Sequence, residues 1–344
     1  MSSRRLIWML CAALLCLPAS CVRRPLYYPD QDSMEVVVKV LWQVQVYPDG
    51  EKPTGVTLYF FRDGEYYRHE TTANVDSCTV RLEPGLYRLF MISQSPEEFG
   101  NLSFSRLTDY DNASVSVQET KSNWYTRSDG EDLIANPEML VAGVSEEFEV
   151  TPEMYRTTTK AENSQVHVIR IPVKPQSIVS QYWVTIYSSN ADVLKAVRAS
   201  TSGMARSFRL THNTTGREKG TQFITQWSLT MDNPATRVGH LDGKITTFGF
   251  PDGQQPSQQR DSTLNVSALL IDDETVEDYV FYVGDKISLE DPPPGYRSLY
   301  RLVFGSVEAP EINPPDVKPA PDGGGGFIAG VADWEEEMKV SIPI

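Results

Sequence analysis

Apolar and polar residues alternate over long stretches of this chain, and period two is typical of β-strands. In residues 34–46, seven apolar side chains fall on one face of such a strand. The segment 86–92 is apolar on both faces, which favours a central strand. Further strands are predicted at 56–60, 66–72, 78–82, 87–93 and 144–150. Turn residues separate these runs, and Glu83-Pro84-Gly85 predicts a hairpin between 78–82 and 87–93. We expect a β-sandwich over residues 34–155.

The pattern breaks between residues 152 and 163 and then resumes, which predicts a second sandwich over residues 163–312. Its strands are predicted at 166–173, 182–187, 208–210, 223–231, 244–250, 264–271 and 280–287. One short helix is predicted at 192–197, with Asp192 as its N-cap. The expected fold class is therefore all-β, with two tandem β-sandwich domains.

The end of the chain has a composition of its own. Residues 313–326 are rich in proline and glycine, which predicts an extended, freely rotating arm. Residues 327–344 form a terminal strand segment in which Val340, Ile342 and Ile344 share one face. This candidate partner strand has two interpretations. It folds back as the last strand of its own domain, which we favour because an unpaired apolar strand invites aggregation, or it is given to a neighbouring molecule.

The first residues of the chain are typical of an export signal. Arg4 and Arg5 precede an apolar run at 6–17, and Ala19-Ser20 supply the small residues that a signal peptidase needs. The cysteine that follows directly resembles a bacterial lipobox. We interpret residues 1–20 as a lipoprotein signal peptide, Cys21 as the lipidated first residue of the mature protein, and residues 21–33 as a tether. The alternatives are an ordinary signal peptide cut nearby and an uncut anchor helix.

Charge and cysteine content narrow the function classes. The chain has 46 acidic and 31 basic residues and a net charge of -15, which disfavours binding to nucleic acid or to anionic lipid headgroups. After Cys21 no apolar run approaches the ~20 residues of a membrane span. The only thiol left to the mature protein besides Cys21 is Cys78. Its place on the apolar face of 78–82 indicates a buried structural thiol rather than a nucleophile.

Residues that could carry chemistry are scattered. The four histidines, His69, His167, His212 and His240, have no metal-ligand spacing, and phosphate-binding loops and nucleophile elbows are absent from the sequence. The acidic groups at 109–112 and 272–274 lack the rest of a calcium loop and are interpreted as turn carboxylates. We predict no enzyme activity and no cofactor or metal. A hydrolase whose catalytic carboxylates come from distant strands is kept as an alternative hypothesis.

Exposed aromatic residues motivate a different alternative. Tyr27-Tyr28, Tyr66-Tyr67 and Trp124-Tyr125 stand among polar residues, where they could stack on sugars or pack against a partner. Aromatic residues in strands are more often ordinary sheet residues. Stacking of such residues on sugars would indicate a glycan-binding surface lipoprotein of a nutrient-uptake system, which is an alternative function for this chain.

Several short motifs carry a family resemblance. They are the lipobox, residues 80–87 (Val-Arg-Leu-Glu-Pro-Gly-Leu-Tyr), residues 98–104 (Glu-Phe-Gly-Asn-Leu-Ser-Phe), residues 201–205 (Thr-Ser-Gly-Met-Ala), Thr247-Phe248-Gly249 and Asp333-Trp334-Glu335. Together they resemble surface lipoproteins of the Bacteroidales that are related to fimbrial-subunit and fimbrium-anchor (FimB-like) lipoproteins.

The resemblance implies a fold and a role. It implies two transthyretin-like, Greek-key sandwiches, a palmitate-bearing lipoprotein in the outer membrane, and a part in fimbrium assembly, anchoring or cell adhesion without catalysis. Fimbrial subunits of this kind join by strand exchange, for which Val340, Ile342 and Ile344 have the form of a donor. An anchor would keep its first strand and its lipid. The cell surface is the expected location. Val22-Arg23-Arg24 replaces the acidic residues that often follow the cysteine in surface-exported members, so the periplasmic face of the outer membrane stays open as the alternative.

Overall fold

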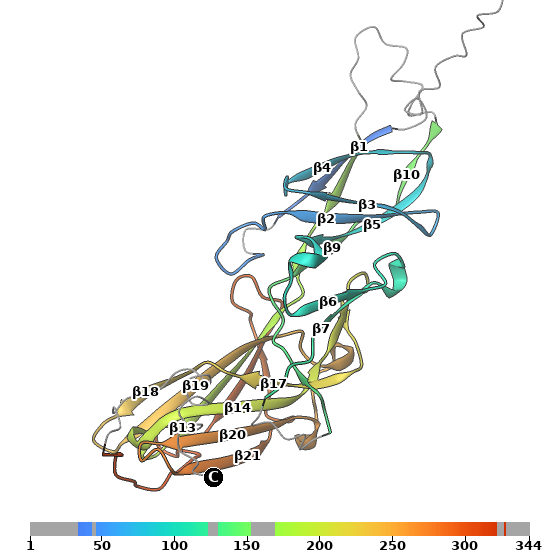
Figure 1. Cartoon of the computed structure of the whole chain (residues 1–344). Coiled ribbons are helices and arrows are strands. Elements are labelled where there is room, and N and C mark those ends of the chain that lie inside the picture. The colour runs from blue at the N-terminus through green and yellow to red at the C-terminus, as the bar shows by residue number, and fades with distance from the viewer. Residues whose placement is uncertain (1–33, 43–45, 123–129, 153–168, 322–326, 328–344) are drawn as a thin grey trace, which may run out of the picture.

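The computed structural model describes residues 34–42, 46–122, 130–152, 169–321 and 327, and within them nearly all of the regular secondary structure is β-strand (Figure 1). The predicted all-β fold class is confirmed. In these described ranges, five 3-10 turns stand between the strands: η3 (Pro96–Glu98), η4 (Tyr110–Asn112), η5 (Ala191–Val193), η6 (Pro251–Gly253) and η7 (Gln259–Asp261). Among these described residues no helix is long and apolar enough to cross a membrane.

The upper part of Figure 1 is a sandwich of two sheets, called here the first body. One sheet has the order β11-β1-β4, and the other has the order β12-β9-β5-β2-β3 with β10 paired to β5. The bounds are β1 (Met34–Val40), β2 (Val56–Arg62), β3 (Glu65–Thr72), β4 (Ser77–Leu82), β5 (Gly85–Ser93), β9 (Val141–Val144), β10 (Phe148–Val150), β11 (Ile169–Val173) and β12 (Gln176–Ser177). Val36, Phe60 and Tyr87 belong to the core between the two sheets.

Two expectations for the first body are wrong. β1 ends at Val40, whereas the alternating pattern predicted a strand to residue 46. β4 and β5 do not form a hairpin, because β4 pairs with β1 and β5 pairs with β2 in the opposite sheet. The connection at Glu83 therefore crosses from one sheet to the other, and the hydroxyl of Tyr87 donates a hydrogen bond of 2.9 Å to the Glu83 carbonyl. Alternation and turn residues do not reveal whether a turn stays within one sheet.

The first body also takes strands from beyond its predicted end. β11 was expected to open the second sandwich, yet it pairs in parallel with β1, and Val38 lies opposite Ile171. β12 pairs with β9 in the other sheet. β4 pairs with one side of β1, and β11 supplies the strand neighbour on the other side. These pairings place residues 169–177 with the first body rather than with the second.

The lower part of Figure 1, the second body, is another pair of sheets. Their orders are β18-β19-β13-β23-β22 and β21-β20-β14-β17-β8. The bounds are β8 (Leu133–Ile134), β13 (Ser180–Ser188), β14 (Leu194–Ala205), β17 (Lys219–Ile224), β18 (Trp227–Asn233), β19 (Val238–Thr247), β20 (Thr263–Leu270), β21 (Val276–Tyr282), β22 (Ser288–Glu290) and β23 (Leu299–Phe304). β8 precedes β11 in sequence but pairs with β17, so the chain crosses between the two bodies more than once.

The helix expected at 192–197 is wrong. Residues 191–193 form the single turn η5, and β14 begins at Leu194. Every residue of β14 is buried, and the strand pairs with both β17 and β20. A fully buried strand and a short buried helix can have the same continuous apolar sequence, so the sequence does not distinguish them. Here the pairing of residues 194–205 with strands on both sides shows a strand. Asp192 caps nothing and instead receives hydrogen bonds from Arg237.

A small sheet joins the two bodies. It has the order β16-β15-β7-β6, with bounds β6 (Leu102–Ser105), β7 (Ser114–Val117), β15 (Ser207–Arg209) and β16 (Thr214–Thr215). Phe90 of β5 and Phe208 of β15 share one hydrophobic cluster, which lies against the outer face of the β5 sheet. β5 is therefore buried on both faces, and the prediction of a central strand is confirmed.

Candidate binding site

The outer face of the sheet β18-β19-β13-β23-β22 carries the candidate site. Along β13, Tyr182, Val184 and Ile186 point into the core of the second body. Strand side chains alternate between the two faces, so the residues between them point outward. Trp183 is one of these, and it is only partly buried. The predicted strand 182–187 already places Trp183 on the face opposite Tyr182. Its position was not a site prediction, because a single aromatic residue in a strand is more often an ordinary sheet residue.

Strand register aligns Trp183 with two cations. Lys244 of β19 is its direct partner on one side, and Arg301 of β23 is its direct partner on the other. The guanidinium carbon of Arg301 lies 5.5 Å from the centre of the indole ring, over one of its faces. Directly paired residues on one face of a sheet are near neighbours. The three side chains therefore form a cation–indole–cation row across three strands.

A second row lies beside the first and is joined to it by hydrogen bonds. Thr185 of β13 is paired with Asp242 of β19, and its hydroxyl donates to Asp242 Oδ1 over 2.5 Å. The same hydroxyl accepts a hydrogen bond of 3.2 Å from Arg301 Nη2. These bonds connect Asp242 and Arg301 through one threonine, so they hold a carboxylate and a guanidinium in fixed positions on the face.

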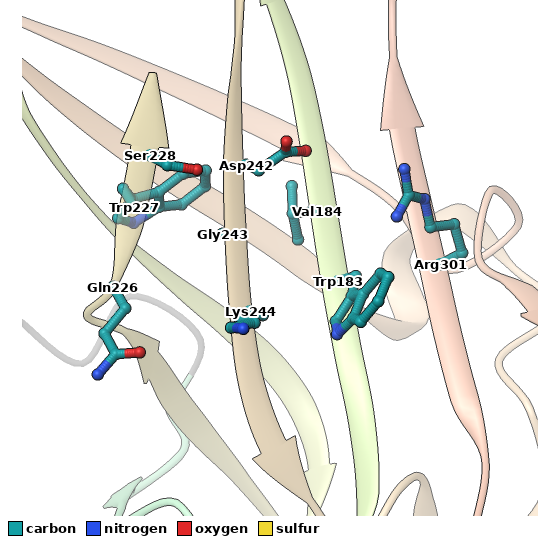
Figure 2. A pocket seen from close by; sticks show the side chains of 9 residues that line it. All are labelled: Trp183, Val184, Gln226, Trp227, Ser228, Asp242, Gly243, Lys244 and Arg301. Carbon is teal, nitrogen blue, oxygen red and sulfur yellow. The ribbon is translucent and has the colours of Figure 1, made fainter. Parts of the chain in front are cut away.

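A hollow of about 690 Å³ lies over these rows, and Figure 2 shows the side chains that line it. Its lining adds Gln226, directly before β18, and Ser228 of β18 to Trp183, Asp242, Lys244 and Arg301. In the described part of the chain no carboxylate forms an ion pair with Lys244 or Arg301. The volume lies in the range of small-molecule pockets, which combine an apolar surface with a few fixed polar groups.

Further along the same face, His240 lies between two carboxylates. Its Nδ1 is 2.7 Å from Asp232 Oδ2, and its Nε2 is 3.2 Å from Asp242 Oδ2. The ring is also tilted against Tyr187, with 5.4 Å between ring centres. Over the described ranges, no group of three or more His, Cys, Asp or Glu side chains could hold a metal ion. Asp242 contacts His240 and also lines the hollow, so it connects this histidine to the candidate site.

The residues singled out from the sequence for lipidation and partner binding lie outside the described part of the chain. These are Cys21 and the candidate partner strand Val340, Ile342 and Ile344. Tyr27-Tyr28 and Trp124-Tyr125 lie outside it as well. The lipid anchor, the tether, the arm and the donor strand remain predictions.

The described aromatic pair is part of the packing. Tyr66 contacts Phe61 edge-on at 5.9 Å, and Tyr67 contacts the buried Tyr87 edge-on at 5.8 Å. Adjacent residues of β3 point to opposite faces, so the two tyrosines cannot form one flat platform. The interpretation of this pair as ordinary sheet residues is confirmed.

The acidic turns hold local structure. Asp272 accepts hydrogen bonds from the backbone nitrogen and the hydroxyl of Thr275. Asp273 forms an ion pair of 2.5 Å with Lys195, whose side chain is buried. Asp109 accepts a hydrogen bond of 2.8 Å from Asn112 Nδ2. These carboxylates stabilise turns, as the sequence predicted.

The described sheets form a β-sandwich fold that is similar to the fold of a candidate adhesin of the Bacteroidales. A solved structure of a candidate adhesin from Bacteroides ovatus has a TM-score of 0.52 at 13% identity, covering 85% of this chain and 96% of that one. The fimbrial anchor protein Mfa2 from Porphyromonas gingivalis gives 0.41 at 14% identity, covering 74% and 84%. A fimbrial assembly protein from Parabacteroides distasonis gives 0.37 at 11% identity, covering 80% and 92%.

The chain belongs to the family of the domain of unknown function DUF5119, whose profile matches residues 20–225. No curated protein sequence matches it. At the level of the fold, the resemblance to Bacteroidales surface proteins is confirmed by the candidate adhesin from Bacteroides ovatus.

Proposed function

We propose that this chain is a non-catalytic lipoprotein, anchored in the outer membrane through Cys21, that acts as an accessory or anchoring subunit of a fimbria-like, adhesive assembly at the cell surface. The observation that carries the proposal is the fold shared with the candidate adhesin from Bacteroides ovatus over 85% of the chain. The lipobox supplies the anchor, and the family match begins at residue 20, directly before the cysteine.

The position of β1 supports a terminal place in such an assembly. β1 lies between β4 and β11 and pairs with both, and Val36 and Val38 are fully buried in the core. Strand exchange needs a vacant position in a sheet. Because β1 fills this position from its own chain, the first body has no need of a donor there, which suits a subunit at the end of a fibre.

For the terminal strand, the assembly role calls for donation to a neighbouring subunit in place of the fold-back that the sequence alone favours, and the test below distinguishes the two. Val340, Ile342 and Ile344 would enter the pockets of a receiving sheet, while the residues between them face away. Exchanged strands bury main-chain hydrogen bonds as well as side chains, so such contacts dissociate slowly. Disruption of the apolar face should abolish assembly, whereas a change on the other face should be tolerated.

The test compares Ile342→Asp with the matched control Ser341→Lys in the full chain, expressed in a Bacteroidales host. Lipidation is measured by incorporation of labelled palmitate, with Cys21→Ser as the negative control. Assembly is measured by crosslinking of outer membranes and by ladders that resist mild denaturant.

The proposal predicts that wild type and Ser341→Lys give labelled, crosslinked ladders, and that Ile342→Asp stays labelled and folded but monomeric. Monomers in all three chains would contradict strand donation. Unfolding of Ile342→Asp alone would show that the terminal strand belongs to its own sandwich. Absence of label in the wild type would contradict the lipid anchor.

A further inference from the structure

We propose that the hollow over β18, β19 and β13 is a binding site for an anionic saccharide, one that bears carboxylate or sulfate groups. This inference is independent of the fimbrial role, because it rests on the side chains of one sheet face. It specifies a ligand chemistry and names the residues that would contact it (Figure 2).

The first argument is the shape of the row. Arg301 covers one face of the Trp183 indole, which leaves the other face for a ligand. That side of the indole adjoins Lys244, and beyond it Gln226 and Ser228 line the hollow. A sugar ring has an apolar C–H face that packs on an aromatic ring and a rim of hydroxyl groups. An indole bordered by an amide, a hydroxyl and a carboxylate fits both surfaces.

The second argument is local charge. The whole chain carries a net charge of -15, yet the two direct neighbours of Trp183 are both cations. Lys244 is exposed, and within the described residues neither cation is neutralised by an ion pair. Charge-assisted hydrogen bonds to carboxylates and sulfates are among the strongest that such side chains make. The two cations therefore favour an anionic sugar over a neutral one.

The third argument is rigidity. Arg301 is held by Thr185 and by the indole, and Asp242 is held by the same threonine. These four side chains, which are those of Trp183, Thr185, Asp242 and Arg301, stand on paired strands rather than on loops. Binding of a ligand would therefore order few side chains. In addition, the Trp183 Nε1 is buried and finds no hydrogen-bond partner in the described chain. A ligand oxygen reached by a small rotation of the indole would satisfy this donor.

The test measures binding to the full mature chain in detergent by calorimetry. The probes are trigalacturonic acid, a sulfated heparin-derived tetrasaccharide, neutral galactotriose and a triglutamate peptide. The first two differ in the anionic group, the third removes the charge, and the fourth keeps the charge but removes the sugar ring.

The variants are Lys244→Gln, Arg301→Gln, Trp183→Phe and Trp183→Ala, with Arg217→Gln and Tyr282→Ala as controls. Arg217 is an exposed cation away from the hollow, and Tyr282 is an exposed aromatic residue on the opposite sheet. Thermal unfolding of each variant shows whether the fold persists. Lys244→Gln alters an exposed side chain, so it keeps the test decisive if a tryptophan variant fails to fold.

At least one acidic saccharide is expected to bind more tightly than galactotriose and than the peptide. Each charge variant should weaken that binding about 10-fold, as expected for loss of one charge-assisted hydrogen bond. Trp183→Ala should weaken it about 3- to 10-fold and Trp183→Phe less, and the controls should bind as wild type.

Any one of three binding results would overturn the proposal. They are equal binding of acidic and neutral sugars, equal binding of trigalacturonic acid and triglutamate, and unchanged binding after Lys244→Gln and Arg301→Gln. Failure of both acidic sugars to bind would overturn it as well. None of these results bears on the crosslinked ladders, so the site and the fimbrial role are judged separately.

Discussion

The buried hydroxyl of Tyr87 explains one of the sequence motifs at the scale of a residue. The ring is fully buried, and its hydroxyl donates to the carbonyl of Glu83 four residues upstream. This bond fixes the chain where it crosses between the sheets of the first body, which resembles the tyrosine corner of other sandwiches. The motif at 80–87, which carries part of the family resemblance, therefore has a structural role.

Tyr87→Phe should lower the free energy of unfolding by about 1 kcal/mol, because one hydrogen bond is lost and a carbonyl is left unpaired. The matched control is Tyr67→Phe, whose ring contacts Tyr87 edge-on. We expect that control to change stability by less than about 0.5 kcal/mol. Urea unfolding of the two variants measures the difference, and equal losses would contradict the role assigned to the Tyr87 hydroxyl.

Cys78 gives a prediction about reactivity and pH. It lies on the core face of β4 opposite Val38, and burial raises the pKa of its thiol. In a chain of residues 22–344, whose only cysteine is Cys78, we expect a thiol reagent to label Cys78 only after unfolding. Rapid labelling of the folded chain would show that the thiol is exposed.

The sign of the pH effect follows from the raised pKa. The folded chain holds the thiol proton more tightly than the unfolded chain, whose thiol titrates near ~8.5. The contribution of the protonated, buried thiol to the free energy of unfolding is therefore complete below about pH 8.5 and declines as the pH rises above this value. Between pH 8 and 10, approximately, the wild type should lose more stability than Cys78→Ala, as measured by urea unfolding at each pH.

At the scale of elements, two motif glycines have a physical explanation. Gly203 has a φ of 82° and lies at the irregularity in the pairing of β14 with β17. A Cβ added there would lie 2.6 Å from the Asp261 carbonyl oxygen. Gly249 has a φ of 101°, and its added Cβ would lie 2.7 Å from the Tyr300 hydroxyl. Both positions combine a left-handed backbone with a close approach, which only glycine tolerates.

Gly203→Ala should therefore destabilise the protein by more than the backbone strain alone. The control is Gly64→Ala in the turn between β2 and β3, where φ is also positive but no atom lies within 4 Å of the added Cβ. The control should cost about 1 to 2 kcal/mol, and Gly203→Ala at least about 1 kcal/mol more. Similar losses in thermal and urea unfolding would show that β14 shifts to accommodate the methyl group.

At the scale of the whole molecule, the crossings between the bodies decide what can fold alone. A fragment of residues 34–155 lacks β11 and β12, which pair with β1 and β9. It would expose the flank of β1 and part of the core around Val173, so we expect it to aggregate or to unfold without cooperativity. The chain 34–321 should unfold in a cooperative transition. Calorimetry distinguishes the two, and a cooperative fragment would show that the first body does not need β11.

The sequence predicted several of the strands but not the candidate binding site. β4 was predicted because its half-buried face imposes strict alternation. β2 and β5 are buried on both faces and were predicted as apolar runs bounded by turn residues, and β3 was predicted because it follows the turn at Arg62-Asp63-Gly64. β6, β7, β8 and β23 were missed, and several of these are short strands whose few residues give little pattern. The hollow was missed because its side chains come from β13, β19, β23 and the start of β18. Single residues such as Lys244 and Arg301 carry no sign in the sequence that a tryptophan lies between them.

The sequence by itself determined the all-β class, the buried state of Cys78 and the turn roles of the acidic clusters, since each depends on side chains a few positions apart. It also carries the lipobox and the terminal strand, which remain predictions. Tertiary structure decided the partner of each strand, the crossing of β11 and β8 between the bodies, and the row of Lys244, Trp183 and Arg301. The physical reason is that strand pairing is a long-range choice among similar alternating segments, and it depends on the register and burial of the whole sheet.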